Sequence, residues 1–136
     1  MKIVLDTNVL VSGFLSPLGA PARIVGLALD GVLTLCVDPR IEYEYLEVLL
    51  RPKWNFNPAD VRVVLEAIME DAIKINAAPL NITIPDADDL MFIETAVTAR
   101  ADAIVTGNKK HFPQKAAGSI PVLSPAEFLE MIRKND

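Results

Sequence analysis

The residues that first suggest chemistry are Asp6, Thr7 and Asn8, which interrupt the apolar run MKIVLDTNVLVSGFL. They either form a turn between a strand and a helix or belong to a site. If KIVLD is a strand, Asp6 lies at its carboxyl end. Asn108, which follows the apolar stretch AIVTG, lies at the end of another strand. Because ligands gather beyond the carboxyl ends of parallel strands, we expect both side chains at one edge of the sheet.

The segment PDADD gathers the acids Asp86, Asp88 and Asp89. Acids at a helix start also cap free N–H groups and stabilise the helix dipole, and for Asp86 and Asp88 both interpretations stay open. Asp89 differs, because at about 100° per residue it projects into the middle of an apolar helix face. A buried charge is costly unless it is paired or binds a metal, so Asp89 is interpreted as functional.

A glutamate of IEYEYLEVLLRPKW is a further candidate. The apolar residues of this stretch define one face of a helix, with Glu42 and Glu44 beside it and Glu47 pointing away. Helix geometry alone does not choose between Glu42 and Glu44, and a solvated surface acid is the ordinary interpretation of either.

Acids that converge on one sheet edge predict a site for a hard cation. Clustered carboxylates raise each other's pKa values, and a divalent cation such as Mg²⁺ or Mn²⁺, which prefers oxygen ligands, removes this penalty. With one His and one Cys, the chain offers no soft-metal site.

The elements that must position these residues alternate between strands and helices. Short apolar runs predict strands at 2–6, 32–37, 103–106 and, more weakly, 121–123. The stretch 81–84 reads as a short edge strand or an extended connection. Continuous apolar strands are typical of a parallel sheet covered on both faces, so we expect an α/β fold, a three-layer α/β/α sandwich with a mostly parallel central sheet.

Helix start signals lie between these strands. Asp38-Pro39 opens a helix to about 51, Asn57-Pro58 precedes the helical pattern VRVVLEAIMEDAIKI, and Ser124 to Glu127 form a capping box. Further helices are predicted over 19–31 and from about 87 to 100, and Thr7 and Asn8 start another after the first strand.

Composition limits the possible classes. A chain of 136 residues with 51% hydrophobic and 23% charged residues fits one globular domain, 1–136. No apolar run reaches the ~18 residues of a membrane span. The net charge of −5 argues against a protein that holds nucleic acid mainly by surface charge. The single cysteine, Cys36, forms no disulfide framework, and the expected location is the reducing cytoplasm.

In these residues and their order, the chain resembles PIN-domain proteins. The resemblance is to the branch that contains toxin components of bacterial and archaeal toxin–antitoxin modules. The similarity covers nearly the whole chain and is carried by IVLDTNVLVSGF, EYLEVLLRPKW (44–54), PDADDLMFIETAVTARADAIVTGNKKHF (85–112) and IPVLSPAEFL (120–129). It implies a metal-dependent ribonuclease that uses Mg²⁺ or Mn²⁺.

Carried over position by position, the resemblance implies that Asp6, Glu44 and Asp89 hold the metal, with Asp86 as a further catalytic acid. It thus selects Glu44 over Glu42. Many members have an acid where this chain has Asn108, which can bind water or a metal weakly but brings no charge. Around these residues, the side chains of Thr7, Asn8 and Thr106 are expected to orient Asp6 and water.

The expected reaction is hydrolysis of an RNA phosphodiester bond by water activated at the cation. Lys109, Lys110 and His111 follow a strand end and are expected to contact the RNA backbone, with Arg51 and Lys53 extending the track. Solvated surface charge is the ordinary interpretation of each of these five residues.

Rival classes remain. A haloacid-dehalogenase-type phosphatase needs Asp-x-Asp after the first strand, and here the third position is Asn8. A receiver domain needs acids that the sequence does not present cleanly. A catalytically weak PIN fold that binds RNA or a partner without cutting is the alternative function. The toxin hypothesis also predicts an antitoxin partner, and the helical pattern at 61–75 leaves room for a homodimer face.

Overall fold

The structure, a computed structural model, describes residues 1–135, so the last residue of the predicted domain 1–136 lies outside the described residues. Its centre is a five-stranded parallel sheet with the strand order β3-β2-β1-β4-β5. The strands are β1 (Lys2–Leu5), β2 (Thr34–Val37), β3 (Ile73–Lys74), β4 (Ala103–Val105) and β5 (Val122–Leu123). Because β1 lies at the centre, its apolar residues Ile3, Val4 and Leu5 are fully buried.

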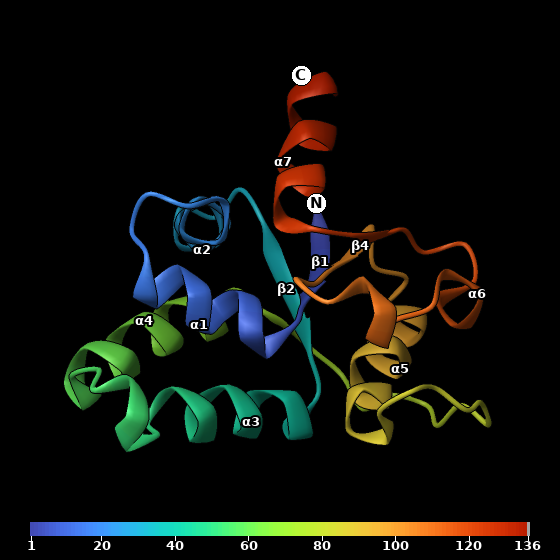
Figure 1. The fold of residues 1–136 in the computed structure, drawn as a ribbon, viewed down its shortest axis with the longest axis horizontal. Helices are drawn as coiled ribbons and strands as arrows, with labels where there is room; N and C mark the ends of the chain where they lie inside the picture. Colours follow the sequence, from blue (N-terminus) through green and yellow to red (C-terminus); the bar gives the residue numbers. More distant parts are fainter. Residues whose placement is uncertain (136) are drawn as a thin grey trace.

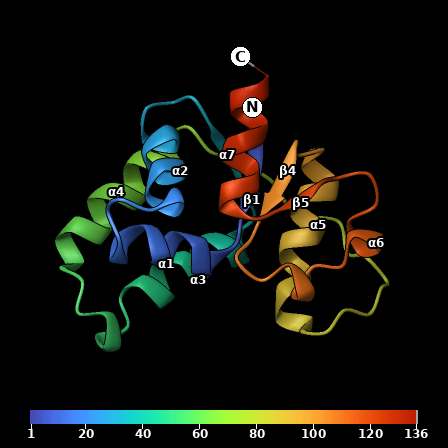
Figure 2. The same ribbon diagram turned by 45° about the horizontal axis from the view of Figure 1, so that its top comes forward.

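Helices cover both faces of this sheet, as the α/β sandwich predicted. They are α1 (Thr7–Leu15), α2 (Ala20–Leu29), α3 (Pro39–Leu49), α4 (Pro58–Glu70), α5 (Leu90–Ala99), α6 (Gln114–Ala117) and α7 (Pro125–Lys134). Three 3₁₀ turns, η1 (Pro52–Trp54), η2 (Ala87–Asp89) and η3 (Lys109–His111), complete the described elements. Figures 1 and 2 show α1, α2 and α4 on one side of the sheet and α5 and α6 on the other.

The predicted caps account for the helix starts. The Asp38 carboxylate accepts from the backbone N–H groups of Arg40 and Ile41 at the start of α3. Ser124 and Glu127 form the capping box of α7. These caps satisfy N–H groups that have no partner within the helix, so each helix begins where the sequence indicated.

The helix expected to run to residue 75 is shorter than predicted. α4 ends at Glu70, and Ile73 and Lys74 form β3, which pairs with Cys36 and Val37 of β2. A periodic apolar pattern does not show that a neighbouring strand offers free hydrogen-bonding groups, and here the sheet edge competes with the last helical turn. The stretch 81–84 is an extended connection and not a strand.

The topology brings the carboxyl ends of β1, β2 and β4 to one edge of the sheet, which we call the carboxyl edge. α1 begins directly after β1, α3 directly after β2, and η3 shortly after β4. Within residues 1–135 no single helix is long and apolar enough to span a bilayer, and α1 with α2, which would suffice together, are bent by 101°.

Candidate metal site at the carboxyl edge

Asp6 is a buried carboxylate at the end of β1. Its residue is 5% exposed, and Thr106 at the end of β4 donates its hydroxyl to Asp6 Oδ2 at 2.8 Å. Burial raises the pKa of Asp6. The Thr106 hydroxyl, the backbone N–H groups of Asn8 and Thr7, and the nearby His111 oppose the rise. The fold therefore holds a desolvated carboxyl group at this point.

Thr106 connects Asp6 to the loop that follows β4. Its side chain is fully buried, and its Oγ1 accepts the backbone N–H of Asn108 at 3.0 Å while donating to Asp6. The predicted role of Thr106, to orient Asp6, is consistent with these contacts. Asn108 itself is exposed beside them.

Glu44 reaches the same edge from α3. Thr7, the residue after Asp6, donates its hydroxyl to Glu44 Oε2. Tyr45, which follows Glu44 in α3, is fully buried, and its hydroxyl donates to the Leu5 carbonyl at 2.5 Å. The charges of Asp6 and Glu44 both add to the effect of burial in raising the pKa of Tyr45. Asp6 and Glu44 thus both lie close enough to Tyr45 for their charges to raise the pKa of its hydroxyl.

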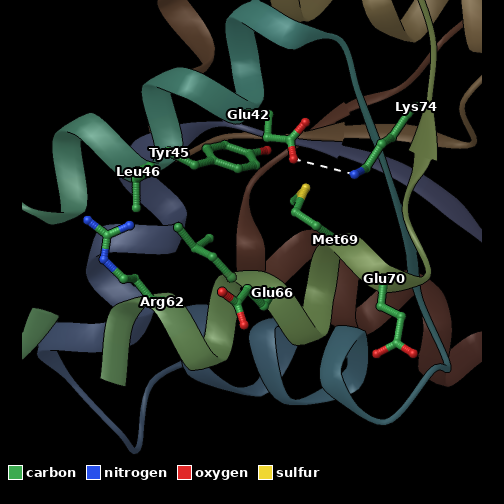
Figure 3. Close-up of a pocket in the computed structure, with 9 residues that line it drawn as sticks. Glu42, Tyr45, Leu46, Arg62, Glu66, Met69, Glu70 and Lys74 are labelled. Atoms are coloured by element: carbon green, nitrogen blue, oxygen red, sulfur yellow. Dashed lines mark ion pairs between the residues drawn. The ribbon is translucent and has the colours of Figure 1, made fainter. Parts of the chain in front are cut away.

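Glu42, the alternative that helix geometry left open, lies elsewhere. It lines a pocket of about 370 Å³ between α3 and α4 and pairs with Lys74 of β3 at 3.5 Å. Figure 3 shows Glu42 and Lys74 facing each other across this pocket, with Tyr45 in its wall and Glu66 and Glu70 on α4. The structure therefore separates the two glutamates and brings Glu44 alone toward Asp6.

Asp89 and Asp86 approach from the start of α5. Asp89 ends η2 with its side chain 18% exposed, and its Oδ2 lies 3.1 Å from Nδ1 of His111. Carboxylate oxygens of Asp86 and Asp89 and a ring nitrogen of His111 lie within 4.8 Å of one another. Asp86 also caps η2 by accepting from the Asp88 N–H at 3.0 Å, so the capping interpretation holds for it as well.

The charges of these groups act on one another. Burial, together with the charges of Asp6 and Asp86, raises the pKa of Asp89 to about 6, and the contact with His111 opposes this rise. Two aspartates 83 positions apart in the chain are thus close enough for one to disfavour ionisation of the other. The edge collects negative charge that the His111 contact offsets only in part.

The types of donor atom gathered at the carboxyl edge suit a hard divalent cation. Asp6, Glu44 and Asp89 offer carboxylate oxygens, which Mg²⁺ and Mn²⁺ prefer, and a cation favours their ionised forms against burial. Among the described residues, the ligand atoms that lie within 4.8 Å of one another belong to Asp86, Asp89 and His111, and Asp6 and Glu44 lie outside that group. The structure thus brings Asp89 together with Asp86 and His111, while Asp6 and Glu44 approach the same edge without joining that group.

The basic residues expected to contact RNA differ in whether their charged groups already have a partner in the protein. Lys109 pairs with Glu127 at 2.9 Å, Arg51 pairs with Glu47 at 2.9 Å, and Lys53 lies over the Trp54 ring. Lys110 is exposed, and it forms no side-chain ion pair within residues 1–135. Lys110 is therefore the most available cation next to the carboxyl edge.

Two contacts of the site had little signal in the sequence. The contact of His111 with Asp89 joins residues from different elements, so no local pattern reveals it. The Tyr45 hydroxyl had one clue: a tyrosine in a buried helix stripe needs a partner for its hydroxyl, and the carbonyl at the end of β1 supplies it.

The chain is similar to known proteins over this site region. A family model described as PIN domain matches residues 2–110, which include Asp6, Glu44, Asp86 and Asp89. The uncharacterized protein MJ1680 of Methanocaldococcus jannaschii is 28% identical over 145 residues, covering 98% of this chain and 93% of that protein. No solved structure matches the chain significantly.

Proposed function

The chain belongs to the PIN-domain family, and on that premise we propose that it is a metal-dependent ribonuclease that hydrolyses phosphodiester bonds. The observation that supports this most strongly is geometric: Thr106 donates to Asp6 at 2.8 Å and His111 lies 3.1 Å from Asp89 at the same edge, where burial and the charge of Asp6 raise the pKa of Asp89. Strongly perturbed acids at a sheet edge are typical of a functional site, and uncompensated carboxylates are typical of one that takes a cation.

In this proposal Asp6, Glu44 and Asp89 hold Mg²⁺ or Mn²⁺. When bound, the cation supplies positive charge for the phosphate oxygens and lowers the pKa of a water molecule. The Thr106 hydroxyl orients Asp6 and the Thr7 hydroxyl orients Glu44, so the acids are positioned before substrate arrives. His111 restrains the Asp89 carboxylate.

The substrate contacts are finer proposals. RNA brings its own negative charge to an acidic protein, so its approach depends on the cation and on local bases such as Lys110. The resemblance to toxin components adds the expectation of a cytoplasmic toxin with an antitoxin partner that covers the carboxyl edge. Growth arrest on expression of the wild type, and no arrest with Asp6→Asn, would support that role.

Cleavage of labelled single-stranded RNA with Mn²⁺, and with EDTA, tests the proposed activity. We expect cleavage by the wild type only with metal, and a loss of at least ~100-fold in Asp6→Asn, the scale of effect seen when a charge-stabilising group is removed. Glu42→Gln is the matched control, because Glu42 lies in the α3–α4 pocket, and it should cleave like the wild type. Equal cleavage by Asp6→Asn would place the activity at another site or in a contaminant.

A second candidate function is favoured by Asn108. It stands, uncharged, where many family members have an acid, and a site with fewer carboxylates binds a second cation less well. A PIN fold that binds RNA without cutting it would give no cleavage by any variant in that assay, and metal-dependent binding of the same labelled RNA in a gel-shift measurement.

A further inference from the structure

A second hollow lies at the carboxyl edge, where α1 and the loop after β4 begin. Its volume is about 260 Å³, and it is enclosed by the start of α1, the loop after β4 and the first residues of α2 and α7. Asn8 and Asn108 line it, and each is within two residues of an end of the Thr106–Asp6 hydrogen bond. The hollow therefore adjoins the two segments that carry the Thr106–Asp6 hydrogen bond.

The polar side chains that line this hollow are available to hydrogen-bond a ligand. Asn8, Ser12 and Asn108 are exposed, and within residues 1–135 none of their side chains forms a hydrogen bond. Each amide offers both donors and an acceptor, and the serine hydroxyl offers either. The hollow thus presents three neutral groups that can hydrogen-bond a ligand edge.

Its walls are apolar. Pro21 and Pro125 contribute rings that have no N–H, and the buried Val9 also lines the hollow. Among the lining residues none is charged. A phosphate would find no cationic side chain among the lining residues, whereas a neutral planar heterocycle matches apolar walls with hydrogen-bonding edges.

Gly107 leaves this hollow open. Its φ is not positive, so the backbone does not require glycine, and a Cβ added there would meet nothing within 4 Å. Neither strain nor crowding inside the protein explains a glycine at this position. A glycine here leaves the mouth of the hollow free of a side chain.

We infer that this hollow, lined by Asn8, Ser12 and Asn108, binds one nucleobase of the RNA strand beside the scissile phosphate. This inference rests on the proposed function, because only that proposal identifies the bound nucleic acid as RNA. The amides and the hydroxyl hydrogen-bond the edge of the base, its faces pack against the proline rings, and Gly107 provides the entrance. Base preference of the enzyme is set here.

Binding measured without chemistry tests this assignment. The wild type is titrated with each of the four ribonucleoside 5′-monophosphates and with ribose 5-phosphate in Mg²⁺, and the side-chain amide signals of Asn8 and Asn108 are followed by NMR. At least one nucleotide should bind about tenfold more tightly than ribose 5-phosphate, the scale of one stacked base. In the Gly107→Val variant, the affinity for that nucleotide should fall to the affinity for ribose 5-phosphate.

Gly26→Val is the matched control. Gly26 lies on α2 outside the lining, and an added Cβ there also meets nothing within 4 Å, so the control should keep the preference. Equal affinity of the wild type for nucleotides and ribose 5-phosphate would overturn the inference, as would an unchanged preference in Gly107→Val.

The two proposals fail in different ways. If the wild type prefers nucleotides but cleaves no RNA, the ribonuclease proposal fails and the base pocket stands. If it cleaves RNA and shows no preference over ribose 5-phosphate, the ribonuclease proposal stands and the base pocket fails.

Discussion

Thr106 is the residue that most directly controls Asp6. It is fully buried, and its hydroxyl donates to Asp6 while accepting from the loop after β4. Thr106→Val removes the hydroxyl and keeps the shape, so the Asp6 carboxylate loses its orientation. We expect Mn²⁺ affinity to fall by about 10- to 100-fold, the range found when groups that support metal ligands are removed. Calorimetric titration with Mn²⁺ measures it.

Thr106→Ser is the control for this prediction. It retains the hydroxyl and loses only a methyl group, so most of the affinity should return. Equal losses in the valine and serine variants would mean that packing of Thr106, and not its hydrogen bond to Asp6, supports the site.

Asp89 gives the protein a pH dependence. Its pKa in the folded protein, about 6, lies above the ordinary value of 3.8, so between these values the folded state binds more protons than the unfolded state. Without metal, Asp89 therefore lowers the free energy of unfolding as pH rises from about 4 through about 6. Urea unfolding in EDTA at several pH values measures this.

Comparison with Asp89→Asn isolates the contribution of this carboxylate. The stability of the variant relative to the wild type should increase as the pH rises through the pKa of Asp89. A difference that does not change with pH would show that Asp89 ionises like an ordinary surface acid and that the site does not concentrate negative charge.

At the scale of elements, α5 is fixed to α3 by a buried carboxylate. Glu94 accepts from Arg40 Nη1 at 3.1 Å and from the backbone N–H of Leu80 at 2.8 Å, while Arg40 Nε also donates to Asp38 at 2.9 Å. Glu94 thus connects the helix that follows Asp89 to the helix that carries Glu44.

Truncation of Glu94 should destabilise the protein. Glu94→Ala leaves the Leu80 N–H without its acceptor and Asp38 with a less restrained Arg40. We expect a loss of about 2–3 kcal/mol in urea unfolding. Glu94→Gln keeps a carbonyl acceptor and should lose clearly less. Equal losses in both variants would mean that the charge of Glu94, and not its acceptor oxygens, fixes α5.

The elements also show what the sequence could and could not predict. Caps and apolar runs depend on neighbours in the chain, so the starts of α3 and α7 and the strands β1, β2 and β4 were predictable. β3 was missed because a two-residue strand exists only through its pairing with β2, a contact across the fold.

The same difference applies to the site. Placing Asp6 and Asn108 at one sheet edge needed only the rule for strand ends. Helix geometry could not separate Glu42 from Glu44, because the choice depends on whether Lys74 or Thr7 lies opposite. The His111 contact with Asp89 depends on the path of the loop after β4 and had no sequence signal.

At the scale of the whole molecule, the role of the sheet is to bring distant residues to one edge. Its parallel order brings acids that are far apart in the sequence to one edge of a protein whose net charge is already −5. Bringing carboxylates together costs free energy that a bound cation returns, so a metal should stabilise the fold as well as serve the reaction.

Mn²⁺ binding to the wild type and to single variants of the three acids tests the central claim most directly. Calorimetric titration should give one saturable site or more in the wild type, and binding weaker by about tenfold or more in each of Asp6→Asn, Glu44→Gln and Asp89→Asn. Glu42→Gln should bind like the wild type. If Glu44→Gln and Asp89→Asn kept full affinity while Glu42→Gln lost it, the cation would lie between α3 and α4, and a metal site at the carboxyl edge would be ruled out.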